Sequence, residues 1–415
     1  MSLTLLLNNS FTRLNIFLIS ILPIGLLVGS LVSNFILILI CIFFIFDLII
    51  KKNWGYLNEI NFYFLVLINI YLIFNSFLIS ENEYSILKSL GFMRFILMAY
   101  AISYYFKKFD KIIIKIFFVF FLVVCVDLVF EFLVGKNILG FESLYPSRLV
   151  GFTSTEHKIG GFYFGFIFLA LSFLIDKKNY MFYLFSIIFF IIAILIGERS
   201  NFIKIFLMYF LFFTFFTQMN FFKKFFVIIL FISIPLTLIL GSQNYYKDRY
   251  VHDVISEELI EKFQTKKEDK IYKKIISENR YFSHYYVATN IFKDNILFGS
   301  GFKSFRIESY KDKFHKDGIY GASTHPHQFH FEILSELGII GYLLIFSNLI
   351  YVLFTKFRQK NQLLELGSFL FIIISLIPIL PSGSFFTSYG ATIFFINYSF
   401  LIRPNNRNKI KNTSE

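Results

Sequence analysis

The fold is decided by residues 112–134, which read IIIKIFFVFFLVVCVDLVFEFLV and hold only three charged residues. As a helix, a run of this length spans the ~30 Å hydrocarbon core of a bilayer. Comparable apolar runs recur along the chain, so we expect an all-α polytopic membrane protein with about twelve transmembrane helices. A β-barrel would instead alternate polar and apolar residues. The expected spans are 14–30, 32–50, 62–80, 90–106, 112–134, 159–175, 180–196, 201–218, 222–241, 333–355, 363–381 and 384–402.

The composition supports the same fold class. Of 415 residues, 56% are hydrophobic and only 16% charged, which is too apolar for a soluble domain of this size. The net charge of +13 does not indicate a nucleic-acid partner, because the lysines concentrate in short loops between apolar runs. Cys41 and Cys125 lie inside such runs and are expected to be packed thiols. The first apolar run has no small-residue cleavage site after it and is expected to remain as a span.

The basic residues alternate between successive loops, and this alternation predicts the orientation. Since positive loops face the cytoplasm, both termini are expected there. Four regions follow: 1–241 with nine transmembrane helices, 242–332 as one large external loop, 333–402 with three helices, and 403–415 as a cytoplasmic tail. The basic loops carry Lys51, Lys52, Lys107, Lys108, Lys111, Lys177, Lys178, Lys223, Lys224, Lys356, Arg358 and Lys360, and the tail carries Arg403, Arg407, Lys409 and Lys411.

All seven histidines fall on the side predicted to be external. His157 lies in the loop 135–158, and the other six lie in 242–332, where 253–279 is expected to form amphipathic helices over the bundle. Imidazoles exchange protons near neutral pH, so their collection on one face indicates chemistry or binding there. The six are His252, His284, His315, His325, His327 and His330.

Among the arginines on the external side, which oppose the usual charge bias, four are candidate ligand contacts: Arg94, Arg148, Arg199 and Arg280. A guanidinium offers a fork of donors that fits phosphate oxygens, so several around one cavity would suit a diphosphate ligand. The alternatives are snorkelling to lipid headgroups and pairing with a carboxylate. Glu198 beside Arg199, and Glu156 near Arg148, are the candidate partners.

The cluster His325-Pro-His-Gln-Phe-His330 allows three interpretations. A metal site is disfavoured because the proline breaks helical spacing and no neighbouring Asp or Cys completes a tetrahedral set. A solvated loop is the second. The third, which we favour, is that one histidine acts as a general base, with Glu332 and Glu336 as orienting groups.

Asp127 and Glu131 are four residues apart and therefore share one face of the helix predicted over 112–134. Carboxylates inside a membrane usually face a cavity or a cation. We expect them to pair with an arginine; the alternative is that they position an acceptor sugar.

Four segments resemble the O-antigen ligase and polymerase family of bacterial envelope glycosyltransferases. They are Arg148-Leu-Val-Gly-Phe with Gly160-Gly161; the turn Gly197-Glu-Arg-Ser-Asn-Phe; Arg280, Ala288 and the stretch from Asp294 through Gly299-Ser-Gly to Phe305; and His327-Gln-Phe-His-Phe-Glu-Ile-Leu-Ser-Glu-Leu-Gly338-Ile-Ile-Gly341. The likeness covers roughly residues 60–355. Gln328 stands where the family usually has Asn, and Ile296 where proline is common.

The resemblance implies a GT-C-like enzyme of the bacterial inner membrane that transfers a glycan from an undecaprenyl-diphosphate donor at the periplasmic face. A ligase would use lipid A-core as acceptor; the alternative, a polymerase, would use a second lipid-linked repeat unit. Transfer would be inverting and would need no metal, cofactor or nucleic acid. The arginines would neutralise the diphosphate leaving group, and His327, supported by Gln328, would take the proton from the acceptor hydroxyl. His325 and His330 would matter less. A non-enzymatic transporter of lipid-linked glycans and an acyl-transferring enzyme are the remaining alternatives.

Overall fold

The computed structural model describes residues 3–80, 82–145, 147–174, 179–241, 250, 280–315, 321–357, 363–378 and 380–402. Every regular element in these residues is helical, and eight segments are long and apolar enough to cross a membrane. Three further apolar helices are shorter, Ile159–Leu174, Tyr180–Leu195 and Leu363–Ser375. The prediction of an all-α polytopic membrane protein is confirmed.

Each predicted span coincides with a helix. Residues 93–106 and 112–134 belong to one long helix that bends at Phe109, where φ is −132°. Short π-helical turns extend α3 over Ser76–Ser80 and α8 over Phe212–Phe216. The helices are α1 (Leu3–Val28), α2 (Ser30–Ile50), α3 (Ile60–Asn75), α5 (Met93–Val134), α6 (Ile159–Leu171), α7 (Asn179–Leu195), α8 (Arg199–Leu211), α9 (Phe221–Gly241), α15 (Phe329–Phe357), α16 (Leu363–Ser375) and α17 (Ser388–Leu401).

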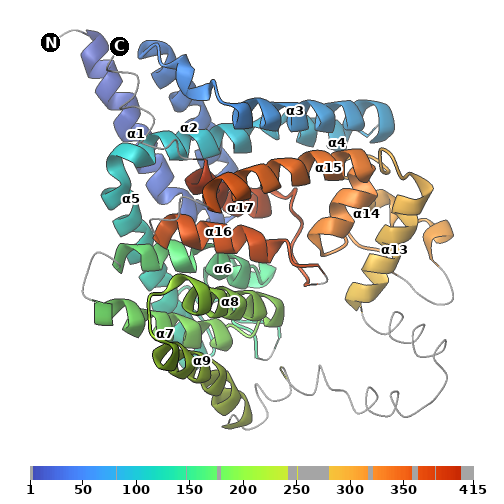
Figure 1. Ribbon diagram of the computed structural model, residues 1–415. Helices are drawn as coiled ribbons and strands as arrows, with labels where there is room; N and C mark the ends of the chain where they lie inside the picture. Colours follow the sequence, from blue (N-terminus) through green and yellow to red (C-terminus); the bar gives the residue numbers. More distant parts are fainter. Residues whose placement is uncertain are drawn as a thin grey trace.

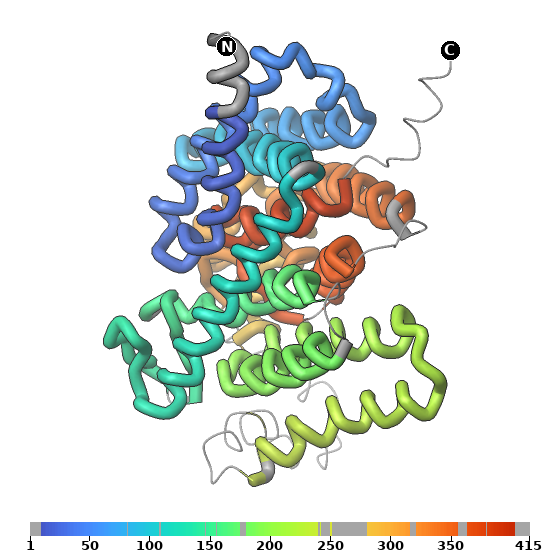
Figure 2. The backbone as a smooth tube through the Cα atoms, turned by 90° about the vertical axis from the view of Figure 1, so that its left-hand side faces the viewer, coloured from blue at the N-terminus to red at the C-terminus, as the bar shows by residue number. Residues whose placement is uncertain are grey.

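The helices form a layered bundle. In Figure 1, α3, α15, α17, α16 and α8 follow one another from top to bottom, and α17 also packs against α5. Helix α6 fills the space between α5, α8 and α16, and nearly all its side chains are buried. Helix α9 lies beside α7 and α8 at the lower end of the molecule (Figure 2).

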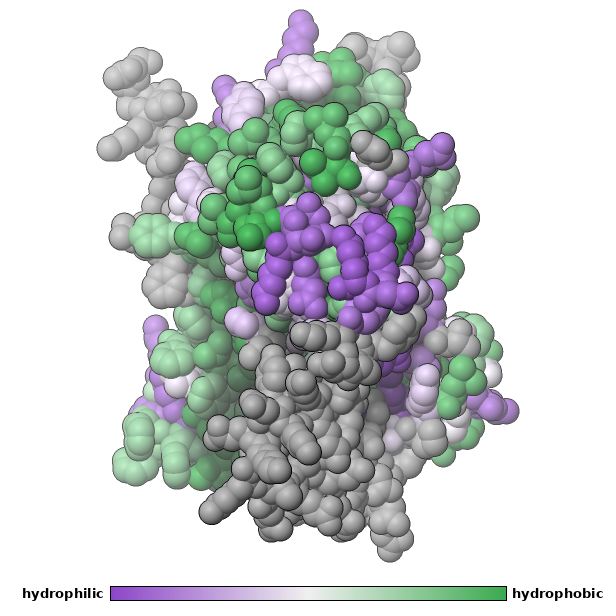
Figure 3. All heavy atoms as spheres, turned by 90° about the vertical axis from the view of Figure 1, so that its right-hand side faces the viewer, coloured by the Kyte–Doolittle hydropathy of each residue, from purple (hydrophilic) through white to green (hydrophobic). Residues whose placement is uncertain are grey.

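The part of the predicted external loop that the structure describes forms a small cap at one end of the bundle. It contains α13 (Arg280–Asp294), α14 (Phe305–Glu308) and a 3₁₀ turn (Asp312–Phe314), and α13 packs on α15. Its core is apolar and its outer face is hydrophilic, as Figure 3 shows over this end of the molecule. His252 and the amphipathic helices predicted over 253–279 lie outside the described residues.

Helix α15 is broken at Gly338, whose φ of 65° and ψ of −170° are strained for residues with a side chain. The break admits the segment 296–301: Ile339 N donates to Ile296 O at 2.9 Å, and Gly301 N donates to Glu336 O at 2.9 Å. A Cβ on Gly338 would lie 2.4 Å from Leu297 O. The glycines in this part of the sequence therefore permit two backbones to touch.

The last two helices are shorter than predicted. The predicted spans 363–381 and 384–402 are wrong in their limits, because α16 ends at Ser375 and α17 begins at Ser388. Pro378 and Pro381 lie between the helices, and proline cannot donate the hydrogen bonds that would continue α16. At ~1.5 Å per residue each helix is only about 20 Å long. Non-helical backbone at membrane depth is tolerated where it lines a cavity, and Ser382, Gly383, Ser384, Phe385 and Thr387 of this connection do so.

Candidate functional site

The connection 376–387 forms one wall of a cavity of about 310 Å³. The other walls come from the loop before α6, the start of α8, and the loop and first turn of α15. Much of the lining is aromatic, contributed by Phe164, Phe329, Phe371, Phe385, Tyr389 and Phe394. The polar lining includes His157, Glu198, Asn201, Lys204, His325 and Ser384. Aromatic faces with a few polar groups suit a ligand that is partly apolar and partly hydrogen-bonding.

An arginine–glutamate pair stands on one wall. Arg148 Nη2 lies 3.4 Å from Glu198 Oε1, and Glu198 also accepts from the side chain of Asn201 and from Gly160 N. The turn is tight because Gly197, with φ of 74°, packs directly against the Ser147 carbonyl. The sequence analysis named Arg199 as the candidate partner of Glu198, and this prediction is wrong. Glu198 pairs with Arg148 instead.

The second predicted partner also differs. Glu156 pairs with Lys158, whose carbonyl accepts from Tyr389 at 2.7 Å. His157, between them, has φ of 47° and lines the cavity with both ring nitrogens buried and without a hydrogen-bond partner among the described residues. Burial, together with the nearby charge of Arg148, lowers the pKa of His157, so the ring is neutral at pH 7.

Asp127 and Glu131 accept hydrogen bonds from backbone N–H groups of the loop that follows α5. Glu131 accepts from Val150 N at 2.9 Å and Gly151 N at 2.7 Å, which fixes the loop that carries Arg148. Asp127 accepts from Ile138 N at 2.9 Å. No ion pair within the described residues includes either carboxylate. The expected pairing with an arginine is therefore replaced by support of the outer loop.

Among the three clustered histidines, His325 lines the cavity. Its Nδ1 lies 3.0 Å from Thr324 Oγ1, and its Nε2 is buried without a partner among the described residues. The His327 ring lies behind it, with ring centroids 4.0 Å apart, and on its other side stands His284 at 5.2 Å. His327 has φ of 58°, and its carbonyl accepts from Ser382 N at 2.7 Å, which ties the cluster to the connection 376–387.

Both imidazoles are held neutral. Burial, then the charges of Lys303, His284 and Arg306, lower the pKa of His325 to about 4. Burial, then His325, His284 and Arg280, lower the pKa of His327 to about 3. Both rings are therefore neutral at pH 7 and can accept a proton, but pKa values this far below neutrality make each ring a weak base in this environment.

His330 and Gln328 have structural partners. His330 Nδ1 lies 3.0 Å from Tyr342 Oη, and its Nε2 lies 2.7 Å from Leu376 O. Gln328 Oε1 accepts from the backbone N–H groups of His330 and Phe331 and so caps the start of α15. Gln328 thereby satisfies donors that would otherwise be unpaired at the helix terminus.

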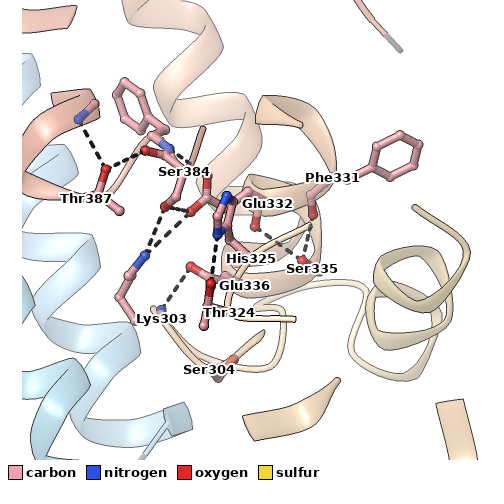
Figure 4. A network of polar contacts seen from close by, with 12 residues as sticks. Lys303, Ser304, Thr324, His325, Phe331, Glu332, Ser335, Glu336, Ser384 and Thr387 are labelled. Atoms are coloured by element: carbon pink, nitrogen blue, oxygen red, sulfur yellow. Dashed lines mark hydrogen bonds and ion pairs between the residues drawn. The ribbon is translucent and has the colours of Figure 1, made fainter. Parts of the chain in front are cut away.

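A buried polar network backs the cavity wall (Figure 4). Glu332, in the first turn of α15, accepts from Ser384 Oγ and from Phe385 N. Lys303 Nζ lies 3.6 Å from Glu332 and donates to Ser384 at 3.1 Å. Glu336 accepts from Lys303 N at 2.9 Å. The two glutamates expected to orient His327 therefore hold the external segment and the connection 376–387 instead.

The remaining predicted arginines do not line the cavity. Arg94 reaches Gly91 O at 2.5 Å and Ser388 Oγ at 3.4 Å, beside the start of α17. Arg199 opens α8, next to the Arg148–Glu198 pair. Arg280 opens α13, and its charge acts on His284 and His327. Arg148 thus lies beside the lining residue Glu198 and Arg280 lies near the histidine cluster, but neither arginine lines the cavity itself.

The sequence reasoning missed Lys204, Asn201 and Ser384. Lys204 had a usable signal, because a lysine in the middle of an apolar helix is costly unless it faces a cavity. No sequence signal pointed to Ser384, since its role depends on how the chain turns between two short helices. Within the described residues, no three His, Cys, Asp or Glu side chains stand together in a way that would hold a metal ion.

Comparison with known proteins agrees with this geometry. A family model described as O-antigen ligase matches residues 184–346, which run from α7 to α15 and include Glu198, Lys204, Lys303 and His325. No curated protein matches the chain. Residues 184–346 are thus similar to the O-antigen ligase family, and the apolar helices are those of a polytopic membrane protein.

Proposed function

We propose that the protein transfers a glycan from an undecaprenyl-diphosphate donor to an acceptor hydroxyl, within the cavity of about 310 Å³, on the periplasmic face of the bacterial inner membrane. The observation that carries the proposal is the meeting of two features at this cavity. The imidazoles of His157 and His325 line the cavity together with Lys204 and Glu198, and Glu198 pairs with Arg148. The segments that carry the family pattern supply both.

The orientation follows from the alternation of basic loops. Both termini are then cytoplasmic, 242–332 is periplasmic, and 1–241 and 333–402 form the membrane bundle. The hydrophilic cap around α13 and α14 fits an aqueous compartment on that side (Figure 3). Cysteines replacing the exposed Lys313 and the loop residue Lys52 test this orientation. Only the first should react with an impermeant thiol reagent in intact spheroplasts.

Catalysis rests on charge and position. The diphosphate leaves with growing negative charge, so cations near the cavity stabilise the transition state. The base is His327, with His325 as the neighbouring imidazole that reaches the cavity surface. The acceptor hydroxyl loses its proton to the imidazole while its oxygen attacks the anomeric carbon opposite the leaving diphosphate, and the anomeric configuration inverts. Holding both lipid-anchored substrates in one membrane cavity lowers the entropy cost of joining them.

A lipid A-core acceptor makes the enzyme a ligase, and a second lipid-linked repeat unit makes it a polymerase. A transporter should place its charged residues near the bilayer midplane and show repeated halves. Here the candidate residues gather at one end of the bundle, which favours an enzyme.

The test is transfer by purified protein with a lipid-linked donor and each acceptor in turn, with and without a chelator. We expect transfer to one acceptor class, unchanged by chelation. Folded wild-type protein that transfers to neither acceptor would overturn the proposal, and loss of activity on chelation would overturn its metal-independent mechanism. Deletion in the cell then separates the two enzymes. Loss of all capped core indicates a ligase, and core carrying a single repeat indicates a polymerase.

A further inference from the structure

We infer that Lys204 binds a phosphate group of the lipid-linked donor inside the cavity. The inference deepens the proposed function and rests on it. Lys204 lies in α8, five residues after Arg199 and so about 7–8 Å further along the helix axis. Its side chain is 4% exposed and lines the cavity.

The ammonium of Lys204 has little to hold it within the protein. It donates to the Pro381 carbonyl at 2.8 Å and lies 5.8 Å from the centre of the Phe164 ring. No ion pair within the described residues includes it. An ammonium has three N–H donors, and a buried cation is costly unless it is paired and fully hydrogen-bonded. An anionic oxygen in the cavity would meet both requirements.

The other charges at the cavity favour an anion rather than oppose it. Glu198 is the lining carboxylate nearest in sequence, but Arg148 neutralises it, and Asn201 and Gly160 N occupy its oxygens. Lys158 pairs with Glu156. Glu198 still attracts Lys204 from a distance. Among the charged residues that line the cavity, however, Lys204 is the one without an ion-pair partner within the part of the chain that the structure describes.

The anion has two conceivable sources: a phosphate of a prenyl diphosphate, or the carboxylate of an acidic sugar. We commit to the phosphate, because Lys204 lies on a membrane-embedded helix whose first residue, Arg199, is already a candidate phosphate ligand. A sugar carboxylate would have no reason to lie so far along the helix, while a diphosphate joined to a prenyl chain must lie next to the lipid.

The test measures binding of geranylgeranyl diphosphate, geranylgeraniol and glucuronic acid to the purified full-length protein in detergent. Lys204→Gln removes the charge but keeps a donor for the Pro381 carbonyl, and Lys204→Arg keeps the charge. Lys224→Gln is the matched control, because Lys224 also donates to one backbone carbonyl, Thr214 O at 2.8 Å, but lies outside the cavity lining. Thermal unfolding checks that each variant is folded; Lys204→Met replaces Lys204→Gln if the latter is not.

We expect Lys204→Gln to weaken diphosphate binding about tenfold or more, as loss of one charge-assisted contact does. Lys204→Arg should stay near wild type, Lys224→Gln should be unchanged, and the affinity for the alcohol should be the same in all variants. Equal weakening for alcohol and diphosphate would mean that Lys204 only supports Pro381, which overturns the inference.

Three other results also overturn it. Diphosphate binding that does not change in Lys204→Gln rejects the contact. An effect confined to glucuronic acid assigns the anion to the sugar. Wild-type protein that does not prefer the diphosphate to the alcohol rejects the diphosphate donor of the proposed function as well. The first two leave the proposed function standing, so the two failures are distinguishable.

Discussion

Lys303 and Glu332 form an ion pair, 3.6 Å from Nζ to Oε1, in which the two side chains are only 3% and 1% exposed. The pair joins the external segment to the first turn of α15, and Ser384 joins it from the connection 376–387. Burying two charges has a large desolvation cost. The attraction between the charges offsets this cost only when their other polar atoms are also hydrogen-bonded. Three parts of the chain must therefore be assembled together to form the cavity wall.

Removing one partner of the Lys303–Glu332 pair should strongly destabilise the folded protein. Lys303→Met leaves the Glu332 carboxylate buried and uncompensated, and we expect a loss of about 3–5 kcal/mol in the free energy of unfolding. The double variant Lys303→Met/Glu332→Gln should recover part of it, because Glu332 then no longer carries an uncompensated charge. Unfolding in mixed micelles measures both. The exposed pair Lys313–Asp294 supplies the control: Lys313→Met should leave the unfolding midpoint unchanged, and an equal effect there would contradict the assignment.

Gly338→Ala should disrupt the docking of the external segment on α15. Its φ and ψ are strained for any residue with a side chain, at a cost of order 1–3 kcal/mol, and the new Cβ would also meet Leu297 O at 2.4 Å. The expected result is a lower unfolding temperature and faster proteolysis in the segment before α15. Gly55→Ala, whose Cβ would meet nothing within 4 Å, is the control. Wild-type stability of Gly338→Ala would show that the break in α15 is dispensable.

Local sequence patterns were enough to locate the helices. Apolar runs located the eight helices that are long and apolar enough to cross a membrane, because hydrophobic length is a property of the run itself. They did not predict that α16 ends at Ser375 and that α17 begins at Ser388. The residues between these helices are largely apolar, but Pro378 and Pro381 interrupt the helical hydrogen bonds and Ser382, Gly383, Ser384, Phe385 and Thr387 line the cavity. Composition cannot distinguish backbone that faces lipid from backbone that lines a cavity.

The candidate site was only partly predictable. The motifs led to Arg148, Glu198 and the histidine cluster, and all of these lie at or beside the cavity. The partners were misassigned because a pairing such as Arg148 with Glu198 joins loops that are distant in sequence. The same reason hid Lys204, whose surroundings come from α6 and the connection 376–387.

Arg280→Ala and Arg199→Ala should each reduce transfer strongly if these guanidiniums contact the diphosphate. Loss of one charge-assisted contact costs about 1.5–3 kcal/mol, which is roughly 10- to 150-fold in rate. Lysine at either position should rescue poorly, because it keeps the charge but loses the fork. Initial rates with the lipid-linked donor measure this, and Lys293→Ala, in the last turn of α13, is the control. Near-normal transfer by both folded alanine variants would remove the arginines from the mechanism.

Stability should depend on the histidines at acid pH. The pKa values of His325 and His327 are lowered to about 4 and about 3 in the folded protein, whereas an unfolded histidine titrates near 6.5. Between these values the unfolded chain binds more protons, so the contribution of the two histidines to the free energy of unfolding falls as pH drops below about 6.5 and is constant above it. The variant His325→Asn/His327→Asn should lose less stability than wild type between pH 6.5 and 4.5. An identical slope in both proteins would contradict neutral, buried imidazoles.

His327→Ala should lower transfer by roughly 10²-fold or more, as removal of a general base usually does. His330→Ala should act mainly on stability, since both of its ring nitrogens bind other parts of the bundle. His325→Ala is the informative comparison, because its ring lines the cavity and lies 4.0 Å from that of His327. We expect the smaller loss at His325, and a pH profile of kcat/KM that shows no titration near 6.5 in the wild type. Full activity of folded His327→Ala would reject His327 as the base. A larger loss in His325→Ala would move the proton transfer to the ring that already faces the cavity.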